Sequence, residues 1–367
     1  MKEKKRVLFV TDTFGYGGAE KQLAFVAEGL LQRGYFVGIC NLNQGKRGEG
    51  ERIVSKDIEM FVADIPYCNA IKSNYDYVAF VCKTARWFKP NIIVGFKELA
   101  NFCSVVTGKI TGIPSVISER ADPFRAYSKA VFSTRVKLWV INHATAGVFQ
   151  TEKAASFYEK RLKKNSVIIP NPVFIKEKIP NIDYSNLPPT VVSLGRLDNK
   201  QKRLDIMLEA FCSFHKRHPE FVLKIYGNGE DEVLVKQWII EKKLTSSVLL
   251  MGVSDNPMRD LSKGGIFLIT SDFEGISNSL LEAMACGLPV VSTDHSPGGA
   301  RLLIKNGENG LLVPVRDPDA ISTALCQYAE NHFLAKHCGT NAKKVLDSFS
   351  PKSILDRWEN VMKKVSK

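Results

Sequence analysis

The stretch IFLITSDFEGISNSLLEAMACGLPVVSTD, residues 266–294, decides the fold of this chain. It opens with Ile266–Thr270, a β-branched apolar run whose length is typical of a strand. A short helix is predicted next over Ser279–Cys286, and Val290–Thr293 then has the pattern of a second buried strand. A strand, a helix and a strand in this order predict a β–α–β unit of a parallel sheet.

The loop Ser271–Ser277 is predicted to lie where a strand ends and a helix begins. Asn278 is the expected N-cap of that helix, and Gly287 its left-handed stop. Unpaired N–H groups and the helix dipole make such a position an anion site. Glu274 lies in the loop, and Glu282 follows eight residues later on the helix. We interpret the acidic loop residue as a contact for sugar hydroxyls while phosphate takes the N–H groups.

Two glutamates at this spacing also occur by chance, as a loop acid and a solvated helix acid. The complete string EGISNSLLEAMACGLPVV, however, resembles the Glu-x7-Glu segment of the retaining, nucleotide-sugar-dependent glycosyltransferases of family GT4, which have the GT-B fold. The resemblance implies that Glu274 holds sugar hydroxyls near the anomeric carbon and that Glu282 takes the ribose hydroxyls. It also implies backbone contacts to phosphate and sugar from Gly275, Ile276, Ser277 and Asn278.

The composition is that of a globular protein with large cores, because 44% of the 367 residues are hydrophobic and 24% are charged. No apolar run reaches the length of a transmembrane helix. Only four apolar residues follow the basic Met1–Arg6, which favours a first strand over a signal peptide. The eight cysteines show no C-x-x-C spacing, so we expect reduced core thiols in the cytoplasm rather than a disulfide framework or a zinc site.

The net charge of +13 is unevenly distributed. Residues 1–180 hold 28 Lys and Arg against 16 Asp and Glu, or +12, whereas residues 181–367 hold 23 against 22, or +1. The excess indicates that the first half meets a polyanion, either an anionic membrane surface, a diphosphate-linked acceptor or nucleic acid; the alternative is a generally basic, solvated surface. No RNP, KH or zinc signature supports nucleic acid.

The segment Phe124–His143 interleaves basic residues with large apolar ones. This pattern suits a helix at a membrane interface. It equally suits a core-facing amphipathic helix whose charges face water.

The chain opens with a strand over Arg6–Val10 and a glycine-rich turn that contains Gly17 and Gly18. These glycines either let the backbone approach a ligand closely or only form a tight turn. They lack the G-x-G-x-x-G spacing of a dinucleotide site. GGAE at this place resembles the GT4 loop that faces the donor phosphates and the acceptor, which favours the ligand interpretation.

The strand predicted over Ser115–Ser118 runs into Glu119 and Arg120. In many GT4 relatives this strand ends in a histidine that contacts the donor sugar, and the matching place here holds Arg120. We keep both residues as candidate catalytic residues. An ion pair between them that closes the strand end is the alternative.

The second half repeats the arrangement of strand, basic turn and helix. The turn Gly195–Arg203 precedes a helix predicted over Leu204–His218, which makes an anion pocket with fixed cations, or else a solvated basic turn. It resembles the GT4 Gly-Arg-Leu…Lys segment that grips the donor diphosphate. The matching residues are Arg196 and Lys202, with Lys200 as an alternative. Farther on, Gly227 and Gly229 follow a strand at the place where the family puts the nucleotide base.

Two groups that could suggest metal binding have simpler explanations. Asp317-Pro318-Asp319 has a metal-binding spacing, but its pattern predicts an N-cap, a proline at the first helical position and an acid in the first turn. His332 and His337 do not share a helix face. We therefore predict no metal site.

The resemblance covers nearly the whole chain and implies an α/β protein of the GT-B fold, in which two doubly wound, Rossmann-like parallel-sheet domains face a cleft. The predicted acceptor-binding domain comprises residues 1–175, joined by a C-terminal helix over 352–367. The predicted nucleotide-sugar domain comprises residues 176–351.

The implied activity is a retaining glycosyl transfer. A hexose or N-acetylhexosamine would move from a nucleoside-diphosphate sugar, preferably UDP-linked, to a lipid-linked or surface-polysaccharide acceptor such as capsule, O-antigen or exopolysaccharide, with α-linkage. No metal or other cofactor is expected, because cations and helix N–H groups can stabilise the leaving diphosphate. The expected location is cytoplasmic, peripheral on the inner face of the membrane. The alternative is a nucleotide-sugar-modifying GT-B enzyme such as an epimerase.

Overall fold

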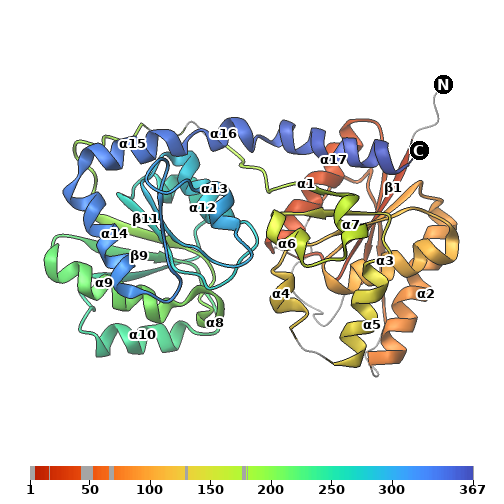
Figure 1. The fold of residues 1–367 in the computed structure, drawn as a ribbon, viewed down its shortest axis with the longest axis horizontal. Helices are drawn as coiled ribbons and strands as arrows, with labels where there is room; N and C mark the ends of the chain where they lie inside the picture. Colours follow the sequence, from red (N-terminus) through yellow and green to blue (C-terminus); the bar gives the residue numbers. More distant parts are fainter. Residues whose placement is uncertain are drawn as a thin grey trace. The chain divides into compact units, whose positions relative to one another are not determined.

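The structure is a computed structural model that describes residues 5–15, 17–42, 53–65, 70–128, 131–175, 179 and 181–366. The chain forms two compact units, shown in Figure 1. Unit 1 comprises Met1–Asn171 and Lys352–Lys367, and unit 2 comprises Pro172–Pro351. The sequence had placed the first boundary between residues 175 and 176.

Unit 1 is built on a sheet of seven parallel strands, β1 (Arg6–Thr11), β2 (Phe36–Asn41), β3 (Glu59–Val62), β4 (Ile92–Phe96), β5 (Ser115–Ser118), β6 (Ala146–Phe149) and β7 (Ser166–Ile168). Their spatial order is β3-β2-β1-β4-β5-β6-β7. The central strands are buried on both faces, as in β1 over Val7–Val10, which explains why their sequences are continuous apolar runs.

The helices of unit 1 are α1 (Gly18–Gln32), α2 (Ala70–Phe88), α3 (Glu98–Thr111), α4 (Pro123–Ala126), α5 (Phe132–Ile141), α6 (Glu152–Ser156), α7 (Lys160–Lys164) and, from the far end of the chain, α17 (Pro351–Val365). Figure 1 shows α17 beside α1. Arg33 donates to Asp356 and Glu359, and Trp358 stacks on Phe96 with ring centroids 5.6 Å apart. The last described helix therefore completes the core of unit 1.

Unit 2 contains six parallel strands, β8 (Thr190–Leu194), β9 (Val222–Tyr226), β10 (Val248–Gly252), β11 (Ile266–Ile269), β12 (Val290–Thr293) and β13 (Leu311–Val313). Its helices are α8 (Asn199–Lys202), α9 (Leu204–Arg217), α10 (Glu232–Glu241), α11 (Pro257–Leu261), α12 (Asn278–Cys286), α13 (Gly299–Leu303), α14 (Pro318–Glu330), α15 (His332–Ala342) and α16 (Val345–Ser348).

The strand order in unit 2 is β10-β9-β8-β11-β12-β13. It is the doubly wound order in which the chain returns to the middle of the sheet and continues on the other side. In such sheets the crevice outside the carboxyl ends of the two strands at the reversal binds ligands. The reversal lies between β8 and β11 in unit 2, and between β1 and β4 in unit 1.

The β–α–β unit predicted from residues 266–294 is confirmed as β11, α12 and β12. Gly287, with φ at 84°, ends α12 in the left-handed conformation, as predicted. The predicted cap is wrong by one residue, because Ser277 rather than Asn278 is the N-cap. Ser277 is extended and its Oγ accepts the N–H of Leu280, so the helix begins at Asn278.

The single helix predicted over Phe124–His143 is wrong, because the described residues there form two helices, α4 and α5. Lys129 and Ala130 lie outside the described residues. The core-facing alternative is confirmed in part, because Ile141 is buried in a hydrophobic cluster of unit 1 and Leu138 and Val140 pack against that cluster. Phe132 and Trp139, by contrast, are 82% and 62% exposed. No helix among the described residues combines the length and the apolar character that crossing a membrane requires.

Candidate functional site

The strand reversal in unit 2 brings together a cation and an acid from two different motifs. Lys202 is the last residue of α8, just after β8, and Glu274 lies in the loop after β11. The Glu274 side chain is buried, the Lys202 side chain is partly buried, and the two form an ion pair. Ser271 Oγ also donates to Glu274 Oε1 at 2.7 Å. Two residues that sequence patterns assigned to diphosphate and sugar thus meet at the place where such sheets bind ligands.

The environment keeps Glu274 ionised. Burial by itself would raise the pKa of this carboxyl group, but Lys202, His295 and the hydrogen bonds from Lys202 and Ser271 outweigh burial and lower it below its ordinary value. In the free protein, the negative charge of Glu274 therefore depends mainly on its lysine partner.

A second ion-pair network holds the two loops in place. Arg316 donates to both carboxylate oxygens of Asp272, with the shortest contact at 2.6 Å, and Arg203 approaches the same group at 3.4 Å. The Asp272 N–H donates to the Gln201 carbonyl, and Thr270 Oγ1 donates to that of Lys202. Asp272 was not among the predicted site residues. It lies two residues before Glu274 and fixes the turn that presents Lys202.

The structure separates the other two candidate cations of the basic turn, Arg196 and Lys200, from Glu274. Arg196 is 71% exposed and donates to Gln201 Oε1 at 2.9 Å. Gln201 in turn donates to the Phe273 carbonyl at 3.1 Å, so Arg196 belongs to the same group of loops without contacting Glu274. Lys200 is exposed. Of the two lysines that the sequence left open, Lys202 is the one that contacts Glu274.

Gly227 and Gly229 are required by close backbone packing. A Cβ atom on Gly227 would lie 1.8 Å from the Gly195 carbonyl oxygen, and one on Gly229 would lie 2.3 Å from that of Leu197. The loop after β9 therefore packs directly on the loop after β8. A small cavity opens beside these loops, and Gly195, Arg196, Lys202 and Thr270 contribute to its lining.

The first turn of α12 is closely supported on one side. Gly299 comes so near the Gly275 carbonyl that a Cβ there would lie 1.7 Å from its oxygen. Ile276 is buried, and the Ser277 and Ser279 hydroxyls are 3.0 Å apart. Asn278 opens the helix and Glu282 lies, half-buried, on its second turn.

The predicted glycines of unit 1 lie at that unit's own strand reversal. Gly17 is the N-cap of α1 and Gly18 its first residue. Glu20 of the same helix pairs with Lys97, which follows β4, and accepts the Thr13 hydroxyl at 2.8 Å. A Cβ on Gly17 would lie 2.3 Å from a Glu20 carboxylate oxygen, so the glycine leaves room for this buried acid.

Glu119 is enclosed within unit 1. Its carboxylate accepts the Tyr158 hydroxyl at 2.9 Å and the N–H groups of Arg120 and Ala121 at 3.1 and 3.2 Å. Burial is the main cause that raises the pKa of Glu119 to about 7. These contacts account for both carboxylate oxygens without a ligand.

Arg120 has separate partners. Its guanidinium lies against two rings, 5.4 Å from the centroid of Phe96 and 5.3 Å from that of Trp358. It donates to Ser118 Oγ and to the Ile169 carbonyl. Within the described residues, the ion pair with Glu119 that the sequence allowed is absent. The strand end is closed by these contacts instead.

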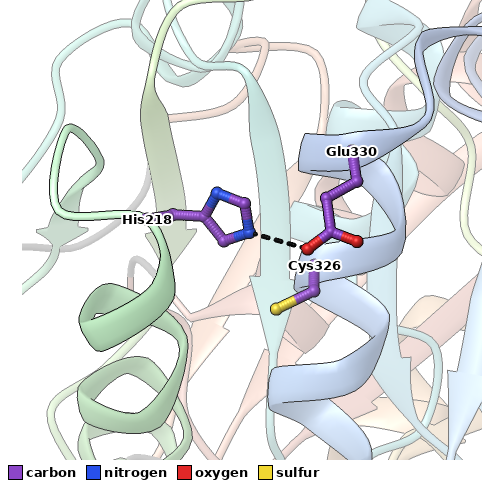
Figure 2. A group of neighbouring side chains, drawn as sticks. All are labelled: His218, Cys326 and Glu330. Carbon is purple, nitrogen blue, oxygen red and sulfur yellow. Dashed lines mark hydrogen bonds and ion pairs between the residues drawn. The ribbon is translucent and has the colours of Figure 1, made fainter.

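One group of described side chains has the composition of a metal site. Figure 2 shows His218 after α9, with Cys326 and Glu330 on α14. Glu330 Oε1 already accepts Arg217 at 2.9 Å and His218 at 3.1 Å. Because His218 precedes β9, the group lies at the amino ends of the strands, opposite Lys202 and Glu274. Its contacts are those of an ion-pair cluster.

Asp317 confirms its prediction as an N-cap, since its carboxylate accepts the Ala320 N–H at 2.9 Å and Pro318 occupies the first helical position. Seven cysteines lie within the described ranges, and all seven are free thiols.

Comparison with known proteins shows that part of the chain is similar to a known family. The model of the family "Glycosyl transferases group 1" matches residues 188–331, which include β8 to β13 and the unit 2 loops that carry Lys202 and Glu274. Among the relatives, the poly(glycerol-phosphate) alpha-glucosyltransferase of Bacillus subtilis is 31% identical over 167 residues, which are 46% of this chain and 24% of that protein.

A second relative is the N-acetylgalactosamine-N,N'-diacetylbacillosaminyl-diphospho-undecaprenol 4-alpha-N-acetylgalactosaminyltransferase of Campylobacter jejuni. It is 36% identical over 161 residues, 43% of this chain and 42% of that protein. The matched regions thus span less than half of either relative.

Solved structures show the fold. The Anabaena protein HepE, in complex with UDP-glucose, superposes with a TM-score of 0.78 over 98% of this chain and 99% of its own at 18% identity. The predicted GT-B fold, with two Rossmann-like parallel-sheet domains, is confirmed.

Proposed function

Because residues 188–331 match the model of the group 1 glycosyl transferases, we propose that the chain transfers a hexose or N-acetylhexosamine from a nucleoside-diphosphate sugar, preferably UDP-linked, with retention of the α configuration. The observation that carries the proposal is the ion pair of the partly buried Lys202 with the buried Glu274 at the strand reversal of unit 2. It combines a phosphate-binding cation with a carboxylate that can accept sugar hydroxyls.

The proposed binding mode exchanges the partners of this pair. The donor diphosphate draws the Lys202 ammonium away, and Glu274 turns its carboxylate to hydroxyls of the hexose. Arg196, being exposed on the same turn, adds a second cation, and the N-terminal amides of α12 add a positive dipole. Charge on the leaving diphosphate is thereby stabilised by the protein itself, so the transfer needs no metal ion.

The remaining predicted contacts complete this proposal. Glu282 takes the ribose hydroxyls, and Gly227 and Gly229 lie beside the nucleotide base. For Glu119 and Arg120, the contacts described above support a role in holding the end of β5 rather than in the chemistry.

We propose an acceptor that is lipid-linked or part of a surface polysaccharide, reached by peripheral contact with an anionic membrane. The +12 charge of residues 1–180 supports this, as do the names of the two relatives above. Exposed aromatic side chains on α5, Phe132 and Trp139, lie next to Arg135 on one helix face. Apolar rings combined with basic side chains bind the interface of anionic lipids.

The decisive experiment supplies the protein with radiolabelled UDP-Glc, UDP-Gal, UDP-GlcNAc, UDP-GalNAc and GDP-Man, in EDTA and without an acceptor. Slow hydrolysis of one donor that releases the α-anomer is expected. Glu274→Ala should abolish it while the circular dichroism spectrum is unchanged. A sugar that is converted while still attached to the nucleotide would identify an epimerase. Absence of both turnover and calorimetric binding for all five donors would contradict the proposal.

A further inference from the structure

His295, directly after β12, is a buried polar side chain without a described function. It is 1% exposed, and neither ring nitrogen has a described partner in hydrogen-bond geometry, although the Ser296 backbone lies close enough to act on the pKa of the ring. Buried polar atoms in folded proteins are nearly always paired, and an unpaired one calls for an explanation. A buried imidazole with two unpaired nitrogens therefore indicates a partner that arrives in another state of the protein.

The loop that carries His295 crosses the loop that carries Glu274. The Glu274 N–H donates to the Ser296 carbonyl at 2.8 Å, and the Ser296 N–H donates to the Asp272 carbonyl at 3.3 Å. Phe273 and Ser296 form a β-bridge. Backbone hydrogen bonds thus join the two loops, and the His295 ring and the Glu274 carboxylate are close enough to act on each other's pKa. Gly299 leaves the space beside the ring, because a Cβ there would be 3.3 Å from Cε1 of His295.

Three charged groups act on the ring. They are Glu274 from the loop after β11, Lys202 from α8, and the neighbouring Asp294. Burial is the main cause that lowers the pKa of His295 below its ordinary value, so the ring is neutral at pH 7 and carries one N–H donor and one acceptor nitrogen. A neutral ring can donate to a carboxylate without adding a buried charge.

In the free protein Glu274 does not need this donor. Lys202 and Ser271 both contact its Oε1. If the donor diphosphate draws Lys202 away, a buried carboxylate loses its cation, which is costly unless another donor replaces it. His295 is the neighbouring side chain with an unused N–H.

We propose that His295 is a positioning residue of the donor site, which hydrogen-bonds Glu274 when bound diphosphate draws Lys202 away and so holds the carboxylate against the sugar hydroxyls. The inference rests on the proposed function and adds a residue to it. It assigns His295 to recognition of the sugar, because the side chain acts through Glu274, and leaves the nucleotide contacts to other residues.

The test compares UDP with the preferred UDP-sugar in calorimetric titrations of the full chain and two variants. His295→Leu removes both nitrogens and leaves an apolar side chain of similar bulk. His295→Gln keeps an N–H donor. We expect the leucine variant to bind UDP within about twofold of the unaltered protein but the UDP-sugar at least about tenfold more weakly. The glutamine variant should recover most of this loss.

Thermal unfolding of the same variants separates a structural role from the proposed one. The leucine variant should be at least as stable as the unaltered protein, because it removes two unpaired buried nitrogens. Equal weakening of UDP and UDP-sugar, or a UDP-sugar affinity that the leucine variant leaves intact, would overturn the inference alone. If the unaltered chain binds none of the nucleotide sugars, the proposed function fails, and the inference with it.

Discussion

Glu274 stabilises unit 2 only as the partner of Lys202, since its carboxylate is buried and carries a charge that the partly buried lysine balances. The sequence identified both residues through separate motifs, and their positions after β8 and β11 predict that they meet. Asp272 and His295 could not be identified in this way. Asp272 pairs with Arg316, which is distant in sequence, and His295 comes near Glu274 only because the Ser296 backbone bonds the Glu274 loop. Neither residue type marks such an arrangement in the sequence.

Replacing Lys202 with alanine should reverse the pH dependence of unit 2. In the unaltered protein the pKa of Glu274 is lowered, so its carboxylate stabilises the folded state at pH values above its unfolded pKa. This contribution is lost as the pH falls through the folded pKa. Without Lys202, burial should raise the pKa, so stability is greatest in acid and falls as the pH rises. Urea unfolding from pH 4 to 8 should show this, with a loss of about 3–5 kcal/mol at pH 8.

Lys200→Ala is the matched control, because this lysine lies on the same short helix but is exposed. It should unfold like the unaltered protein at every pH. The same curve for both variants would contradict the importance of the ion pair.

Glu119→Gln should stabilise unit 1 at neutral and alkaline pH. Because the pKa of Glu119 is raised to about 7, its contribution to stability is fully present below its unfolded pKa and is lost as the pH rises through about 7. Glutamine keeps an acceptor for the two N–H groups and a donor for Tyr158 without the buried charge. The expected gain is about 1–3 kcal/mol at pH 8 and near zero at pH 4.

Glycosyl transfer by the Glu119→Gln variant tests whether Glu119 instead takes part in catalysis. Activity should persist if Glu119 only closes the end of β5. A loss of turnover in a more stable protein would show that the carboxylate takes part in the chemistry.

Helices with caps and breakers were predicted more accurately than those without them. Asp317-Pro318 marks the start of α14 and Gly287 the end of α12, and both are where the sequence put them. The separation of α4 from α5 was missed because no glycine or proline interrupts Phe124–His143. Its apolar periodicity was correct, but periodicity does not say whether a face packs on a core or meets solvent.

The contribution of the α14 N-cap, Asp317, to stability can be compared with that of Asp319 in the same first turn. Asp317→Ala should cost about 1 kcal/mol of stability, because the Ala320 N–H loses its acceptor. Asp319→Ala, in the same first turn, removes only a favourable interaction with the helix dipole and should cost about 0.3–0.5 kcal/mol. Denaturant unfolding of both variants gives the comparison, and equal losses would refute the assignment of the cap.

The exposed face of α5 predicts binding to anionic vesicles. The double variant Phe132→Ser/Trp139→Ser should sediment at least about tenfold less with phosphatidylglycerol vesicles at low salt than the unaltered protein, because two large rings leave the interface. Trp87→Ser, which removes a tryptophan that is 66% exposed on α2, should have little effect. Equal binding to phosphatidylcholine vesicles would argue against an electrostatic contribution.

At the scale of the whole molecule, the sequence predicted two doubly wound sheets because strands, glycine turns and helices alternate twice along the chain. The packing of Trp358 was less accessible, since the apolar period of α17 shows that the helix needs a partner without naming it. In the structure the partners of α17 are Phe96 of β4 and the helix α1, both within the first hundred residues of the sequence.

Trp358→Ala should destabilise unit 1 selectively. The ring is fully buried between β4 and α17 and also faces the Arg120 guanidinium, so its removal should cost about 3–5 kcal/mol. Hydrogen exchange should show faster opening of β1, β4 and β5 while the amides of unit 2 stay protected. Trp87→Ala, on the surface of the same unit, is the control and should be nearly neutral. Uniform loss of protection across both units would contradict the prediction.

Because α17 belongs to unit 1, its late synthesis also determines when unit 1 can finish folding during translation. As a nascent chain leaves the ribosome, the sheet of unit 1 emerges first, yet the surface that receives Trp358 stays uncovered until residues 352–367 have been synthesised. Unit 2 has all of its own segments before that moment. The part of the protein made first is therefore the part that can be finished last, and during elongation its apolar flank is the surface that chaperones would need to shield.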